Sequence, residues 1–134
     1  MVDVQGVIRT FLLAQSGIAN LVNTRVFAGR EVPARGYAPA DGPAIAFKVR
    51  GGAGEYRGRD YEDALIEPSV QFKCYGRSEI EAFELYRALV DGLHNGHSAT
   101  VLHGEEVGVG QPLEEAETEW PFVLAFFDVM VRSS

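Results

Sequence analysis

The segment from Glu119 to Arg132 constrains the fold most, because it is apolar on both faces of a β-strand. The two faces are Phe122, Leu124 and Phe126 on one side, and Val123, Ala125, Phe127 and Val129 on the other. A strand that is apolar on both sides is covered on both sides. We therefore expect a central strand with a helical layer on one face. A single helical layer cannot cover both faces of so small a sheet, so a neighbouring subunit is the candidate for the second cover.

Two further segments alternate between apolar and polar residues, which is typical of half-buried strands. They are Ala44–Arg50 and Leu65–Tyr75, and Cys74 is on the inward face of the second. The segment between them begins with a glycine-rich stretch, Gly51 to Asp60, which predicts a loop and an antiparallel pair. Shorter strands are expected at Thr24–Ala28 and Ala99–His103, and Val107–Val109 is compatible with another.

Two main helices are predicted. Asp3–Gln15 has an apolar stripe at helical spacing, and Ser78–Leu93 begins with Ser78 and Glu81 in the arrangement of a capping box. The buried stripe expected for the second helix is Ile80, Phe83, Tyr86, Leu89, Val90 and Leu93. Ile18–Val22 indicates a short helical turn, and the proline- and glycine-rich residues 29–43 indicate a loop. The prediction is an α+β fold: an antiparallel sheet of four to five strands packed against two main helices, in a single domain of residues 1–134.

Composition excludes several classes of protein. The 134 residues are 46% hydrophobic and 23% charged, which is too apolar for a disordered chain. The net charge of -7 argues against tight non-specific binding of nucleic acid. Cys74 is the only cysteine, so an internal disulfide is excluded. The sequence has neither a basic leader followed by an apolar core nor an apolar run near 20 residues, so we expect no signal peptide, no membrane association and folding in a cytoplasm-like compartment.

The charge is divided unevenly along the chain. Residues 1–60 carry a net charge of +3 and residues 61–134 carry -10. One interpretation is that the two halves mix in space, so that the division has no consequence. The other is that surfaces of opposite sign exist and pair between copies of the chain.

No catalytic or cofactor site is recognisable. His94, His97 and His103, with Glu105 or Glu106, are the only candidates for a metal site, but Asn95–Gly96 ends the helix between the first two histidines. The glycine-rich loop lacks the Lys-Ser/Thr pair of a phosphate-binding loop. We therefore predict no enzyme, no cofactor and no metal site, and keep a small metal- or ligand-binding domain as an alternative.

The order of these segments resembles the tail-completion, or tail terminator, proteins of long-tailed bacteriophages. An amphipathic helix leads to Ser-Gly-Ile-Ala-Asn-Leu-Val and then to Thr-Arg-Val-Phe. A Pro/Gly loop precedes Gly-Pro-Ala-Ile-Ala-Phe, and Pro-Ser-Val-Gln-Phe-Lys-Cys-Tyr-Gly-Arg-Ser runs into Glu-Ala-Phe-Glu-Leu-Tyr. An acidic stretch and a long terminal strand follow. The resemblance covers nearly the whole chain and rests on order and spacing rather than on a catalytic motif.

The resemblance implies a structural virion protein of the tail and neck, assembled in the host cytoplasm. Such proteins form a hexameric ring on the last ring of the tail tube, stop its growth and bind the head-side neck, or connector, protein. DNA passes through the lumen without specific binding, and an acidic wall suits that passage because it repels phosphates. Another neck or connector protein, a stopper or an adaptor, is the nearest alternative.

The family has no catalytic residues to transfer, so the interface residues are predicted from this sequence alone. Arg57 and Arg59, in the loop after the first alternating strand, are expected to contact a neighbouring protein. Trp120 and Phe122 begin the two-faced strand and are expected to bury against another subunit. An acidic lumen or rim is expected from Glu105, Glu106, Glu114, Glu115, Glu117 and Glu119.

Overall fold

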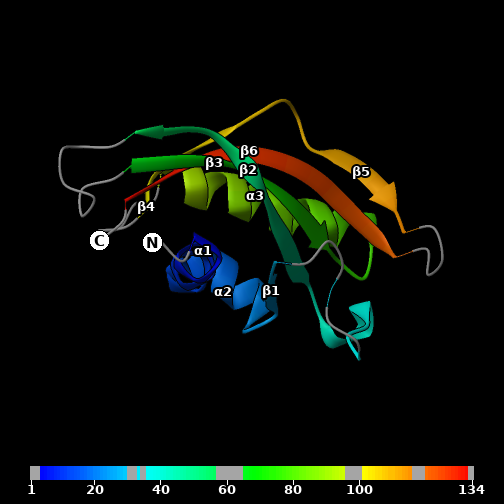
Figure 1. The fold of residues 1–134 in the computed structure, drawn as a ribbon. Helices are drawn as coiled ribbons and strands as arrows, with labels where there is room; N and C mark the ends of the chain where they lie inside the picture. Colours follow the sequence, from blue (N-terminus) through cyan, green and yellow to red (C-terminus); the bar gives the residue numbers. More distant parts are fainter. Residues whose placement is uncertain are drawn as a thin grey trace.

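All helices of the described chain lie on one face of a six-stranded sheet (Figure 1). In this computed structural model the described residues are 4–29, 33, 36–56, 65–95, 101–115 and 120–132. Along the chain the elements are α1 (Val4–Ala14), α2 (Ser16–Val22), β1 (Val26–Ala28), a 3-10 turn η1 (Pro39–Asp41), β2 (Ala44–Tyr56), β3 (Leu65–Tyr75), α3 (Glu79–Asn95), β4 (Val101–Glu106), β5 (Gln111–Glu114) and β6 (Pro121–Arg132). The predicted α+β class is confirmed.

The strand order is β1-β2-β3-β6-β4, and β5 pairs with the same edge of β6 as β4 does, closer to the start of β6. β6 is therefore an interior strand, as its two apolar faces predicted. β2 and β3 form the expected antiparallel pair, with Phe47 opposite Phe72. Only β1 runs parallel to its neighbour, which it contacts at three positions of β2.

Two predictions about strand limits are wrong. Residues 51–56 were expected in a loop but continue β2, because antiparallel pairing with β3 extends to Tyr56 and Leu65 across two register shifts. The short strand near Val107–Val109 lies instead at Gln111–Glu114. Sequence composition missed the first because pairing with a long partner strand outweighs the low strand preference of glycine.

The main core lies between the sheet and the helices. The inward faces of β2, β3 and β6 contribute Ile45, Phe47, Val70, Phe72, Cys74, Val123, Ala125 and Phe127, and all are buried. Helix α1 adds Ile8, Phe11 and Leu12, as its stripe predicted. Phe72 lies between Phe47 and Phe127, with ring centroids 5.6 Å from each. This core holds α1, α2 and α3 against a single sheet face.

The predicted buried stripe of α3 is only partly right. The buried residues on α3 are Ala82, Leu85, Leu89, Gly92 and Leu93. Phe83, Tyr86 and Val90 are half-buried, and Ile80 is 74% exposed. The helix has apolar residues on two sides, and periodicity alone does not tell which side meets the sheet.

The start of α3 is capped as expected, with one difference. The backbone N–H of Glu81 donates to Ser78 Oγ at 3.3 Å. The Glu81 carboxylate, however, accepts from the backbone N–H of Arg77 at 2.8 Å and from its guanidinium, one residue before the cap. The bond to Ser78 satisfies an amide group that the first turn of a helix leaves unpaired, and the bonds from Arg77 hold the residue before the cap against that turn.

Candidate functional site

The predicted interface residues Trp120 and Phe122 lie in a small aromatic cluster on the sheet face opposite the helices. The Trp120 ring meets those of Tyr37 and Tyr75 edge to face, with centroids 5.7 and 6.3 Å apart. Phe122 is 5% exposed and packs on Tyr75 at 5.3 Å. Side chains of the same molecule therefore cover the second face of β6 near its start. Trp120 keeps a half-exposed surface, so its contact with another subunit stays a prediction, as does that of Phe122.

Glu115 joins this cluster as a hydrogen-bond acceptor. The Tyr75 hydroxyl donates to Glu115 Oε1, and Lys73 Nζ lies 3.3 Å from the same oxygen. Lys73 Nζ also lies 4.8 Å from the centroid of the Phe122 ring. Burial, and then the bond to Glu115, raise the pKa of Tyr75, so its hydroxyl keeps its proton and donates. Glu115 is therefore half-buried and engaged within its own chain.

Glu106 is held in the same manner on the other face of the sheet. The Tyr86 hydroxyl donates to Glu106 Oε2 and accepts the backbone N–H of Gly110 at 3.0 Å. A Cβ atom at Gly110 would lie 2.6 Å from two carbons of the Tyr86 ring, so the contact requires glycine. Tyr86 thereby ties α3 to the connection between β4 and β5.

The remaining predicted acidic residues divide into two groups. Glu105 and Glu114 are exposed, on β4 and β5. Glu117 and Glu119 lie outside the described residues, as do the predicted contact residues Arg57 and Arg59. Four of the six glutamates predicted for a lumen or rim are described, and two of these four are exposed. The lumen or rim role stays a prediction for all six.

A basic strip runs along β2 and β3 on the face away from the helices. It consists of Lys48, Arg50 and Lys73, and the first two are exposed. Lys48 stands opposite Gln71, which stands opposite Phe126 of β6. Arg50 Nη1 donates to Gln71 Oε1 at 3.3 Å, and its Cζ lies 5.8 Å from the Phe126 ring centroid. The guanidinium therefore lies over the Phe126 ring and remains exposed.

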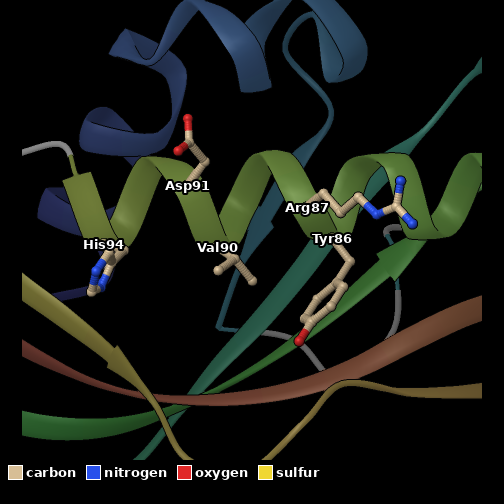
Figure 2. A pocket seen from close by; sticks show the side chains of 5 residues that line it. All are labelled: Tyr86, Arg87, Val90, Asp91 and His94. Atoms are coloured by element: carbon tan, nitrogen blue, oxygen red, sulfur yellow. The ribbon is translucent and has the colours of Figure 1, made fainter.

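The outer side of α3 carries two shallow hollows that share Arg87. One, of about 450 Å³, is lined by Glu79, Ile80, Phe83, Glu84 and Arg87. The other, of about 250 Å³, is lined by Tyr86, Arg87, Val90, Asp91 and His94. In Figure 2, Tyr86 and Val90 point from α3 toward the strands, and Asp91 points the other way. The side chains that line these hollows carry three carboxylates and one guanidinium, so this side is acidic.

The candidate metal residues are not assembled by the described structure. His94 is exposed on α3, His97 lies outside the described residues, and the side chain of His103 on β4 is not described. Over the described ranges, no group of three or more His, Cys, Asp or Glu side chains is placed to hold a metal ion. Cys74 is fully buried, and burial raises its pKa, which suits a structural thiol rather than a nucleophile.

Two surfaces were not singled out by sequence reasoning. The basic strip is visible in the sequence only as three polar positions of two alternating strands. The exposed face of α3 was hidden because Ile80 was assigned to the core. None of the helices in the described part of the chain is long and apolar enough to cross a membrane.

Comparison with known proteins gives a structural neighbour but no family. No protein-family model matches the chain, and no curated protein matches its sequence. The fold is similar to that of a chain in a solved structure described as the virion of a native gene transfer agent (GTA) particle. The TM-score is 0.62, the sequence identity is 16%, and the match covers 96% of this chain and 93% of the other. The chain therefore shares its whole fold with a component of that particle.

Proposed function

We propose that this chain is a structural virion protein of a phage-like particle, which assembles into a ring that caps the tail tube. The observation that carries the proposal is the similarity of fold to a chain of a gene transfer agent virion over nearly the full length of both chains. Because the match spans nearly all of both chains, neither chain needs an insertion or an extra domain to take part in the same kind of assembly. The order of sequence segments that resembles tail terminator proteins supports the same function independently.

The surface properties suit a ring through which DNA moves. The net charge of -7 favours a wall that repels phosphates and does not retain DNA. The basic strip lies on the sheet face away from the helices, where Glu115 pairs with Lys73, and the acidic hollows lie on α3, so the two surfaces differ in their charged residues. Such a distribution suits a head-to-tail ring, in which each copy presents two different surfaces to its neighbours.

The proposed action is steric and electrostatic. A ring seated on the last tube ring ends its growth, since it occupies the surface to which the next tube subunit would bind. Its other side is then available to the head-side connector protein. Catalysis has no part in this function, which needs only a surface that fits the tube end and a lumen wide enough for DNA.

Electron microscopy with mass measurement tests the proposal. The purified protein is imaged alone and after addition to preformed tail tubes, and it is also added to polymerising tube protein. Rings, density at tube ends and shorter tubes are the expected results. A protein that stays monomeric, leaves tube ends bare and does not change tube length would refute tube capping.

A stopper or adaptor of the head-tail connector is the second candidate, because the description of the structural neighbour names a virion and no position within it. The same experiment separates the two. A connector component binds a portal-side ring and leaves the tail tube end uncapped, whereas a terminator does the reverse.

A further inference from the structure

The sheet face away from the helices leaves part of β6 open to solvent (Figure 1). Leu124 and Phe126 alternate with the core residues Val123, Ala125 and Phe127, so their side chains point away from the helices. Both side chains are only half-buried. Since a strand with two apolar faces is covered on both sides, this part of β6 offers apolar surface to a second molecule.

Two exposed apolar side chains extend this surface beyond β6. The backbone N–H of Val107 donates to the carbonyl oxygen of Phe126 at 2.8 Å. The Glu106 side chain bonds to α3, so that of Val107, the next residue, points to the opposite face. Leu113 stands opposite Phe122, whose ring also lies on that face. Val107 and Leu113 are 53% and 43% exposed, and neighbouring apolar residues of this kind are typical of a protein-protein contact.

Arg50 supplies a positive charge on the β2 side of this surface. Its guanidinium lies over the Phe126 ring, and Nη1 donates to Gln71. The described residues thus give Arg50 a hydrogen-bond partner and a ring, but no carboxylate. The exposed guanidinium is therefore available to a carboxylate of another molecule.

Glu105 and Asp128 supply two negative charges on the β4 side. The two residues are directly opposite each other in the β4–β6 pair. Asp128 lies between the core residues Phe127 and Val129, so its side chain points away from the helices, and that of Glu105 lies on the same face. Like charges directly opposite each other destabilise a sheet. No cation of the described residues pairs with either carboxylate, so a cation from another molecule would relieve this repulsion.

The surface is complementary to itself. We call it the outer face of β6 and define it by Arg50, Glu105, Val107, Leu124, Phe126 and Asp128. The strand order places β2 and β4 on opposite sides of β6, so a rotation of 180° about an axis along β6 brings Arg50 of one copy to Glu105 of the other. Their positions along the strands also agree. The Arg50 guanidinium lies at Phe126, and Glu105 lies opposite Asp128, two residues or about 7 Å further along β6.

We propose that two copies of this chain pack face to face through the outer face of β6, about a two-fold axis parallel to that strand. The contact buries the apolar residues of both copies and forms two symmetric ion pairs between Arg50 and Glu105. Two sheets that pack in this way have the arrangement of a β-sandwich. The contact is isologous and closes with two copies, so it goes beyond the proposed ring function and does not depend on it.

Charge reversal tests the pairing. Arg50→Glu and Glu105→Arg are made as separate variants, and the mass of each protein in solution is measured by sedimentation over a range of concentrations. The wild type is expected to form dimers as its concentration rises. Each single change places like charges together at both ion pairs, and we expect it to weaken the dimer at least about tenfold. An equimolar mixture of the two variants restores opposite charges at both ion pairs and should form mixed dimers.

Matched controls change the net charge equally on the helical side of the molecule. Thr10→Glu with Asn20→Glu matches Arg50→Glu, and Thr10→Lys with Asn20→Lys matches Glu105→Arg, because both positions are exposed on α1 and α2. The controls are expected to dimerise as the wild type does. Circular dichroism of every variant shows whether a loss of dimers reflects unfolding.

A cross-link gives a second measurement that does not depend on charge. Stacked sheets lie about 10 Å apart, so a bismaleimide of about that length should join two Leu124→Cys chains close to the two-fold axis. Cys74 is fully buried, so the reagent reacts with the new cysteine. Asn20→Cys, on α2, is the control and should remain monomeric under the same conditions.

The outcomes separate this inference from the proposed function. A wild type that stays monomeric up to about 1 mM, single variants that dimerise as the wild type does, or a mixture that does not pair overturns the two-fold contact. Tube capping by such a protein leaves the ring function intact. If the wild type stays monomeric and Arg50→Glu abolishes tube capping, the outer face of β6 binds the tube protein and not a second copy. A dimer that leaves tube ends bare supports the two-fold contact and refutes tube capping.

Discussion

Replacing Tyr86 with phenylalanine tests how α3 is attached to the β4–β5 connection. The change keeps the ring that packs beside Gly110 and Phe83 and removes only the hydroxyl. Two hydrogen bonds are lost, one donated to the Glu106 carboxylate and one accepted from the Gly110 N–H. Burial, and then the bond to Glu106, raise the pKa of Tyr86, so the hydroxyl is protonated and able to donate at neutral pH.

The expected loss of stability follows from these two bonds. A bond to a charged group contributes about 1.5–3 kcal/mol and a neutral one about 0.5–1.5 kcal/mol. Glu106 is half-buried and regains water when the hydroxyl is removed, so we expect the low end of the range, about 2 kcal/mol in total. For a domain of this size, that corresponds to a fall in Tm of roughly 6–8 °C.

Urea unfolding of the wild type, Tyr86→Phe, Glu106→Gln and the double variant measures the effect and its origin. An unchanged slope of the free energy of unfolding against urea would show that only stability has changed. The double-mutant cycle should give a coupling of about 1 kcal/mol between the two residues. A Tyr86→Phe protein within about 0.3 kcal/mol of the wild type would refute the assignment of this network as the link between α3 and β4–β5.

Three further predictions concern single groups. Burial raises the pKa of Tyr37 to about 12, so the unfolded chain releases this proton first as the pH rises; stability should fall between pH 10 and 12, less steeply in Tyr37→Phe, as followed by chemical unfolding. Hydrogen bonds from Arg77 lower the pKa of Glu81, so Glu81→Gln should be less stable than the wild type at pH 7. The difference should shrink as the pH falls from about 4.3, the pKa of a free glutamate, and vanish below the lowered pKa, as followed in thermal melts. Cys74 should resist a thiol reagent until the protein unfolds in urea, and rapid labelling of the native protein would contradict its burial.

Much of the fold follows from local sequence patterns. The stripe of α1, the alternation of β3 and the two apolar faces of β6 each encode the burial that the structure has, because burial against one face leaves a period in the sequence. Gly51–Tyr56 does not follow from such a pattern, since its strand conformation depends on pairing with β3.

The candidate site was less predictable than the fold. A run of glutamates looks uniform in sequence, yet Glu106 and Glu115 accept hydrogen bonds from tyrosines that are 20 and 40 residues away, while Glu105 and Glu114 are exposed. No feature of the neighbouring sequence distinguishes the hydrogen-bonded glutamates from the exposed ones. The separation depends on which strand face each residue occupies and on what packs against that face.

The sequence by itself determined the α+β class, the antiparallel β2–β3 pair, the interior position of β6 and the absence of an internal disulfide. Only the tertiary structure decided which side of α3 is buried, because the helix has two apolar sides and the one that meets the sheet is chosen by contacts with α2 and the strands. That choice leaves Ile80 exposed. It also places β2, with Lys48 and Arg50, toward one edge of the sheet and β4 and β5 at the other, since strand order is a property of long-range pairing and not of any local segment.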